Sequence, residues 1–518
     1  MRSVCYFIFL IATFQLLSFQ SSASQKLSSF LHKPKLVLVL VIDQFRSDYL
    51  PRFEKKFQPA LKGNQVGGFN YLMNQGAYFP FAHYDIFQAM TCPGHSMILT
   101  GSYPVENGIM FNDWFDQETG QLTYCVSDNE SGISPRRLKT TTVSDEWKNI
   151  DKAGKVVSIS LKDRSAVMLG GHRADTVLWM NEKSLRWETS RYYGVEPSWV
   201  VKNNSKLEKL KGSQYDWKDL KRSISYDDRK VIETPYGNEA TVDLSIEALE
   251  NEKLGLKDNN TDFLFISFSA HDLAGHQYGP NSPEMESMSL SDDQQISRLL
   301  NEIKKRVGLE NVVIVFTADH GVSPSAQYLA DKKIKSKEID YLDLFKKLNS
   351  TLDEQFGKPK NGPWINAVRY FNFFINHKVL NEKKLNAEVV SQVMKKVIQQ
   401  EPYEPIVYTK GEIARGLIIP SFWAEALSHQ FDLSKGGDVF FMPEPFHYEK
   451  TKVSVTHMTG YNYDTRVPLI LVGSAFKPGV YGENAKVVDI APTLSFVLNI
   501  LSPPKARGRV LHEALKSN

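Results

Sequence analysis

KLVLVLVID, residues 35–43, is the stretch that decides the fold. Residues 35–42 form an apolar run without polar alternation that is too short for a membrane span, and such a run is typical of a β-strand buried on both faces. Similar short runs rich in Val and Ile recur at wide intervals, at residues 155–161, 262–268, 311–316 and 467–472. A buried helix segment is the alternative for each run, but their length and β-branched content favour strands.

Helical periodicity appears between these strands. Within residues 291–307 the apolar positions are spaced as on one helix face, namely Ile296, Leu299, Leu300, Ile303 and Val307. Strands that alternate with helices predict an α/β fold with a doubly wound, mainly parallel central sheet.

Two long stretches depart from this alternation. They are rich in Lys and aromatic residues and lie at about residues 170–260 and 323–451. We interpret them as inserted cap segments within one domain that covers residues 33–515. The aromatic tract at residues 179–193 is as consistent with an accessory core as with substrate contact.

Bulk composition excludes some partners and indicates a compartment. The 62 Lys and Arg nearly balance 59 Asp and Glu, and the resulting charge of +3 gives no reason to expect nucleic acid as a partner. Residues 1–24 have a basic start, an apolar middle and a small-residue end, which predicts a cleaved signal peptide and a periplasmic or secreted protein. No later stretch predicts membrane insertion. The oligomeric state stays open.

Cysteine usage limits the chemistry. After signal cleavage only Cys92 and Cys125 remain, and they are consistent with either one disulfide or buried thiols. Two thiols are too few and too far apart for a thiolate zinc site. Any metal must therefore be bound by His and carboxylate side chains.

Ionisable residues follow four of the predicted strands. Asp43 follows the first, Lys162 and Arg164 the second, Asp272 the third, and Asp319 with His320 the fourth. Because ligands of open α/β sheets bind outside the carboxyl ends of the strands, we expect these residues to face one crevice.

The carboxylates and histidines among these residues suit metal ligation. Asp272 and His276 are four residues apart, a spacing that lets both reach one ion from a loop or first helical turn. Asp319 and His320 are adjacent, Asp43 follows the first strand, and His457 precedes the last. Together these six residues suit two metal ions, although Asp and His ligands fit several divalent metals.

Thr91 has two interpretations. The segment TCPGHS, residues 91–96, precedes an apolar stretch and predicts a turn that enters a helix. Thr at such a position is commonly an N-cap, which is the preferred interpretation on local evidence. The free backbone N–H groups there also favour an anion, as a phosphoryl acceptor requires.

The motifs taken together resemble the alkaline phosphatase superfamily. In chain order they are Val-Ile-Asp43-Gln, Thr91-x-Pro-Gly-His, Tyr-Pro-x-x-Asn-Gly, His-Asp272-x-x-Gly-His276, Thr-Ala-Asp319-His320-Gly and His457-Met-Thr-Gly. More narrowly, Thr91, Asn112 and the Lys162-Asp-Arg164 motif resemble phosphate-irrepressible alkaline phosphatases of the PafA type.

This resemblance implies two Zn²⁺ ions per chain, one on Asp272, His276 and His457, the other on Asp43, Asp319, His320 and the Thr91 oxygen. It further implies that Thr91 is the nucleophile, that a phosphothreonine intermediate forms, and that Asn112, Lys162 and Arg164 bind the phosphoryl oxygens. His95 and His271 match no ligand position, so packing or support is expected of them.

Lys162 and Arg164 favour small-molecule phosphate monoesters as substrates, because a dianionic monoester gains more from two cations than a diester does. The alternatives are a phosphodiesterase or nucleotide pyrophosphatase on the same fold and a binding protein without catalysis. A formylglycine sulfatase is disfavoured, because neither Thr91 nor Cys92 precedes the Pro and Arg pattern that such enzymes need.

Overall fold

A computed structural model describes residues 33–257, 259–450 and 453–516. The predicted signal peptide at residues 1–24 lies outside the described residues. Within them no helix combines the length and apolar character needed to cross a bilayer.

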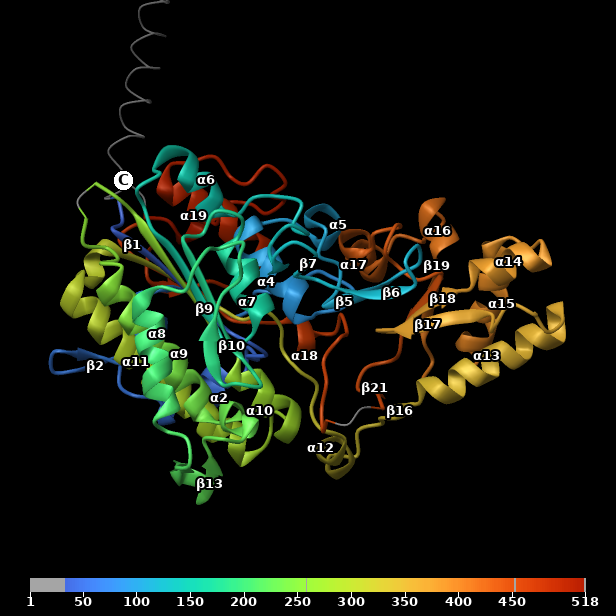
Figure 1. Cartoon of the computed structure of the whole chain (residues 1–518), viewed down its shortest axis with the longest axis horizontal. Helices are drawn as coiled ribbons and strands as arrows, with labels where there is room; N and C mark the ends of the chain where they lie inside the picture. Colours follow the sequence, from blue (N-terminus) through green and yellow to red (C-terminus); the bar gives the residue numbers. More distant parts are fainter. Residues whose placement is uncertain (1–32, 258, 451–452, 517–518) are drawn as a thin grey trace, which may run out of the picture.

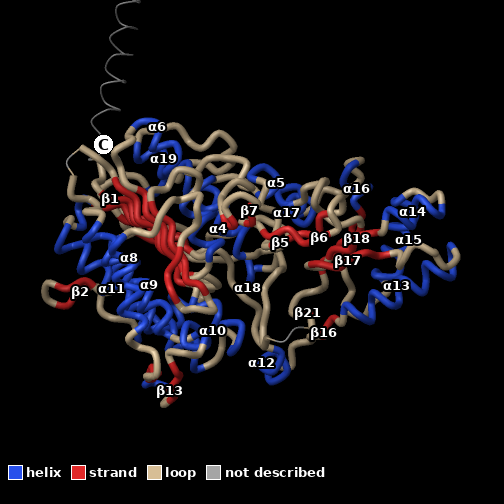
Figure 2. The backbone as a smooth tube through the Cα atoms, viewed as in Figure 1, coloured by secondary structure: helices blue, strands red, loops and turns tan. Residues whose placement is uncertain are grey.

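A nine-stranded sheet forms the centre of the molecule (Figures 1 and 2). Its strands, in spatial order, are β11 (Arg186–Glu188), β10 (Thr176–Asn181), β9 (Val156–Ser160), β14 (Asp262–Phe268), β1 (Leu36–Ile42), β15 (Val312–Thr317), β22 (Leu469–Val472), β4 (Ala77–Phe79) and β23 (Gly479–Val480). The five predicted strands are confirmed as β1, β9, β14, β15 and β22.

The central strands run parallel. β1 pairs in parallel with β14 on one side and β15 on the other, and every residue of all three strands is buried. Burial on both faces explains why the sequence of these strands is mainly apolar rather than alternating. β22 is antiparallel to β15, so the sheet is mainly parallel, as predicted.

Helices cover both faces of the sheet, which confirms the doubly wound α/β class (Figure 1). One layer contains α9 (Pro235–Asn251), α10 (Ala270–Tyr278) and α11 (Pro283–Arg306), which pack on one another. The other contains α4 (Thr91–Thr100), α6 (Val143–Ile150), α7 (Asp163–Gly170) and α19 (Ile490–Leu498). α11 begins eight residues before the predicted helical segment 291–307, because the Ser282 hydroxyl accepts a hydrogen bond from the Met285 N–H and Pro283 occupies the first turn.

The two predicted insertions differ in how they join the central body. Within residues 170–260, β10 and β11 extend the central sheet, and α9 packs against β14 and β9. Residues 323–451 instead include an antiparallel sheet with its own apolar core. This smaller lobe lies beside the central body in Figure 1 and contains β17 (Ile365–Arg369), β18 (Asn372–Ile375), β20 (Val439–Met442), β19 (Ile406–Thr409), α13 (Tyr341–Phe356), α14 (His377–Lys383) and α15 (Ala387–Gln399).

Candidate active site

The ionisable residues predicted at the strand ends converge in the structure. Asp43 directly follows β1, Asp319 and His320 follow β15, and Asp272 lies in the first turn of α10 after β14. Because these strands are adjacent and parallel, their carboxyl ends bring the four residues to one edge of the sheet. All four are at most 2% exposed.

Asp43, Asp319 and His320 form the first of two clusters, with one ligand atom from each lying within 4.8 Å of the others. His320 Nε2 lies 3.4 Å from Asp43 Oδ1 and 3.4 Å from Asp319 Oδ2. Asp43 Oδ1 is buried and accepts no hydrogen bond from the described residues, whereas Asp319 Oδ2 lies 3.0 Å from His95 Nδ1. A buried carboxylate oxygen such as Asp43 Oδ1 is costly without a donor unless a cation binds it, so these residues fit a metal ion.

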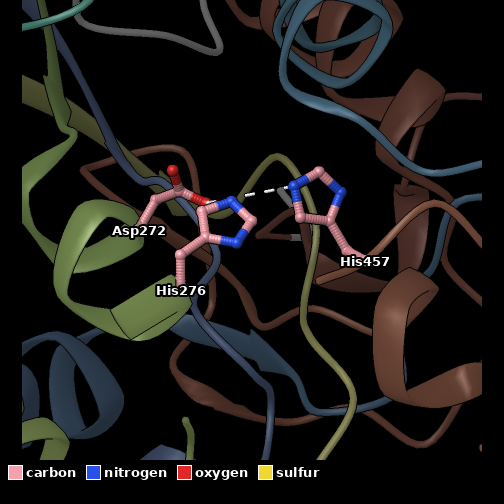
Figure 3. A group of neighbouring side chains, drawn as sticks. All are labelled: Asp272, His276 and His457. Carbon is pink, nitrogen blue, oxygen red and sulfur yellow. Dashed lines mark ion pairs between the residues drawn. The ribbon is translucent and has the colours of Figure 1, made fainter. Parts of the chain in front are cut away.

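Asp272, His276 and His457 form the second cluster, and one ligand atom from each again lies within 4.8 Å of the others. Figure 3 shows both imidazole rings beside the Asp272 carboxylate. His276 Nε2 lies 3.2 Å from Asp272 Oδ1, and His457 Nε2 lies 4.0 Å from the same oxygen. The two clusters are adjacent: the ring of His320, from the first cluster, stacks on the ring of His457, from the second, with centroids 3.7 Å apart.

The three histidines share a feature that suits metal binding. Each Nδ1 lies 2.9 Å from a backbone carbonyl oxygen, at Val455 for His276, Gly321 for His320 and Ala89 for His457. A carbonyl only accepts, so Nδ1 must carry the proton and Nε2 is left with a free lone pair. Such carbonyl contacts typically orient metal-binding imidazoles.

Burial and crowding shift the pKa values in this region. Burial, with the neighbouring Asp319 charge, raises the pKa of Asp43 well above its usual range. Burial, with His320 and His276 nearby, lowers the pKa of His457 well below its usual range. A neutral His457 imidazole is the form that ligates a metal.

Thr91 is the first residue of α4 rather than its N-cap. Met90 occupies the N-cap position, and no side chain caps it. The Thr91 hydroxyl therefore satisfies no orphan N–H of the helix, which removes the capping interpretation. Its Oγ1 instead lies 3.5 Å from His320 Nε2, beside the first cluster.

Close packing fixes α4 against the first cluster. A Cβ atom built on Gly94 would lie 2.3 Å from the Asp319 carbonyl oxygen, so only glycine permits this approach. His95 is fully buried, with Nδ1 3.0 Å from the Thr91 carbonyl oxygen and 3.0 Å from Asp319 Oδ2. Its Nε2 lies 2.9 Å from the Ser267 hydroxyl.

Asn112 is held beside the start of α4. Its Oδ1 accepts a 2.8 Å hydrogen bond from the Cys92 N–H, and its carbonyl accepts one from the Cys125 N–H. Cys92 and Cys125 form a disulfide, which links both contacts. The Asn112 amide nitrogen donates no hydrogen bond to the described residues and is thus available for another acceptor.

Lys162 and Arg164 lie at the start of α7, which follows β9. The buried Lys162 ammonium pairs with Asp43 Oδ2 at 2.6 Å and Asp272 Oδ2 at 2.5 Å, so it bridges the two clusters. Burial alone would lower the pKa of Lys162, but these carboxylates raise it. Arg164 Nε is buried and donates no hydrogen bond to the described residues.

A cavity of about 370 Å³ lies beside Lys162 and Arg164. Its wall includes the aromatic tract for which the sequence left two interpretations open, since Trp179 contributes to it while remaining only 5% exposed. The lining residues are Tyr124, Leu161, Lys162, Asp163, Arg164, Trp179, Met180, Asn181, Glu182, Lys183 and Glu188.

Sequence reasoning missed one residue of this region. Gln44 donates a hydrogen bond from its backbone N–H to Asp319 Oδ1 and another from Nε2 to Asp272 Oδ1. The only available signal was its place in the motif around Asp43.

Comparisons with known proteins agree with this geometry. Residues 37–435 match the family model described as type I phosphodiesterase / nucleotide pyrophosphatase. Alkaline phosphatase PafA of Elizabethkingia meningoseptica is 30% identical, over 93% of this chain and 95% of its own. Alkaline phosphatase PhoV of Synechococcus elongatus is 30% identical, over 93% of each chain. The crystal structure of wild-type PafA superposes with a TM-score of 0.84 at 29% identity, covering 94% of this chain and all of that one.

Proposed function

The chain belongs to the type I phosphodiesterase / nucleotide pyrophosphatase family, within the alkaline phosphatase superfamily, and we propose that it hydrolyses phosphate monoesters as an alkaline phosphatase. The observation that carries this proposal is the Thr91 hydroxyl next to two adjacent Asp/His clusters, in a chain 30% identical to two alkaline phosphatases along nearly its whole length.

The proposed cofactor is two Zn²⁺ ions per chain. Asp272, His276 and His457 would hold one, and Asp43, Asp319 and His320, with the Thr91 oxygen, would hold the other. When bound, such ions activate a hydroxyl as nucleophile and neutralise charge that develops on attacking and leaving oxygens. Three protein ligands in each cluster match the open coordination of catalytic zinc sites.

The proposed reaction is a double displacement at phosphorus. Thr91 Oγ1 attacks the phosphoryl group, the alcohol leaves, and water hydrolyses the resulting phosphothreonine to release inorganic phosphate. The buried position of Thr91 at the start of α4 restricts its approach to phosphorus and keeps bulk water from the nucleophile.

Asn112, Lys162 and Arg164 are the proposed ligands of the nonbridging phosphoryl oxygens. Among the described residues, the Asn112 amide nitrogen donates no hydrogen bond and Arg164 Nε has no acceptor, which supports this role. Once cations neutralise Asp43 and Asp272, the Lys162 ammonium becomes available for a phosphoryl oxygen. Two cations beside the phosphoryl group favour a dianionic monoester over a diester, in which one oxygen carries a second organic group.

We further propose that the enzyme acts in the periplasm or outside the cell, after removal of residues 1–24. The disulfide between Cys92 and Cys125 supports an oxidising compartment.

Trapping the covalent intermediate tests the proposed role of Thr91. We expect acid quenching of zinc-loaded enzyme during turnover, followed by peptide mass spectrometry, to find one phosphoryl group on Thr91. Thr91→Ala should abolish both label and turnover, whereas Thr100→Ala, at the opposite end of the same helix, should keep the label. Full turnover by Thr91→Ala would exclude Thr91 as the nucleophile.

A further inference from the structure

Gln44 has an unusual backbone conformation for its position. It directly follows Asp43, is 1% exposed, and has φ of +69°, in the left-handed region that non-glycine residues rarely adopt. This conformation is unfavourable for a residue that carries a side chain. The side-chain Oε1 is also buried without a hydrogen-bond donor among the described residues, which further lowers stability.

The contacts of Gln44 explain why these costs are tolerated. Its backbone N–H donates to Asp319 Oδ1 at 3.1 Å, in the first cluster. Its side-chain Nε2 donates to Asp272 Oδ1 at 2.6 Å, in the second. One residue thus binds a carboxylate of each cluster, through two different groups.

Gly275 supplies the space for this arrangement. A Cβ atom built on Gly275 would lie 1.9 Å from Gln44 Oε1, so the amide occupies the volume that any side chain at position 275 would need. Gly275 lies inside α10, where glycine is less favourable than alanine. Its presence between Asp272 and His276 is therefore explained by packing against Gln44.

We propose, on the basis of the metal sites in the proposed function, that Gln44 is a positioning residue that fixes the carboxylates of Asp272 and Asp319 for metal binding. The side-chain amide serves the Asp272 cluster and the backbone N–H serves the Asp319 cluster. An amide suits this role because it restrains a carboxylate without adding positive charge. The Lys162 ammonium, by contrast, carries a positive charge that opposes a bound cation.

Zinc affinity provides a test that does not depend on activity. Each of the two zinc affinities is measured by competition with a chromophoric chelator in wild-type protein and in Gln44→Gly. The glycine keeps the backbone N–H and relieves the left-handed strain but removes the amide. We expect the affinity of one site to fall about 10- to 100-fold while the other stays within a few fold. Two unchanged affinities would overturn the proposal.

Two further variants separate positioning from folding. Gln44→Asn tolerates the left-handed conformation but is one methylene too short to reach Asp272, so it should show the same selective loss in a folded protein. Gly275→Ala should also weaken that site, by displacing the Gln44 amide. In the double variant Gln44→Gly/Gly275→Ala the clash is gone, so its loss should equal that of Gln44→Gly alone. Additive losses in the double variant would overturn the proposal.

These outcomes are distinct from failure of the proposed function. Wild-type protein that binds fewer than two zinc ions would contradict the proposed function itself. Wild-type protein with two sites and a Gln44→Gly variant with the same two affinities would contradict only the role of Gln44.

Discussion

Removal of the Lys162 ammonium should destabilise the metal-free protein in a way that metal reverses. The Lys162 side chain is 3% exposed, and its ammonium pairs with the carboxylates of Asp43 and Asp272, whose side chains are at most 3% exposed. Lys162→Met keeps most of the side-chain volume but leaves both carboxylates without this cation. Breaking a buried ion pair by removing one partner costs about 3–5 kcal/mol. We therefore expect the free energy of unfolding, measured with denaturant and a metal chelator, to fall by about that amount.

pH dependence gives a second signature of the same variant. In the wild-type protein the pKa of Asp272 is held well below its usual range, because the charges of His276 and Lys162 outweigh the effect of burial. Without the ammonium both carboxyl pKa values rise in the folded state, and a raised folded pKa favours folding at low pH. The loss of stability in Lys162→Met should therefore be largest near neutral pH and shrink as pH falls and the carboxyls take up protons.

The control is Lys206→Met, which removes an exposed ammonium paired with Glu247. An exposed pair contributes at most about 1 kcal/mol, so this variant should lose little. Excess Zn²⁺ should reduce the deficit of Lys162→Met, because bound cations neutralise the same carboxylates. A Lys162→Met protein that loses no more stability than Lys206→Met in chelator would refute the reasoning.

Three further predictions concern other contacts. Gly94→Ala should lower kcat/KM about 100-fold, because its Cβ would clash with the Asp319 carbonyl and displace Thr91. The control Gly482→Ala, whose Cβ would have no atom within 4 Å, should leave steady-state rates unchanged. Full activity of Gly94→Ala would contradict this prediction. Cys92→Ser/Cys125→Ser should lower the free energy of unfolding by about 3–4 kcal/mol for a bridge between residues 33 apart, and a reductant should destabilise wild-type protein but not the variant. Burial raises the pKa of Asp293 from 3.8 to about 6, so its contribution to stability is present below pH 3.8 and is lost as pH rises to 6. The free energy of unfolding of Asp293→Asn, measured across this pH range, should lack this decline of about 3 kcal/mol. An identical decline in both proteins would exclude Asp293 as its source.

The sequence carried most of the information on the central sheet. β1, β14 and β15 are buried on both faces, so their sequences show mainly apolar runs without polar alternation, and these are visible without a structure. The direction of β22 was not predictable, because a short apolar run reads the same in parallel and antiparallel pairing. β4 and β23, with three and two residues, are too short to give a pattern.

The six predicted metal ligands form two clusters because they follow neighbouring strands or belong to segments that return to the same edge. Short motifs indicate residue types and spacing, which suffices for such residues. They do not indicate contacts between distant segments. The Lys162 bridge and the two hydrogen bonds of Gln44 join positions far apart in the chain, and the left-handed backbone at Gln44 has no signature in an ordinary glutamine.

The most direct test of the account is the ratio of kcat/KM for p-nitrophenyl phosphate to that for bis-p-nitrophenyl phosphate, measured on zinc-loaded enzyme and on Arg164→Ala. We predict a ratio well above one for wild-type enzyme and a much smaller ratio for Arg164→Ala, because in the proposed function the guanidinium binds a phosphoryl oxygen that only the monoester leaves free. Comparable or faster cleavage of the diester by wild-type enzyme would contradict the central claim and favour a phosphodiesterase.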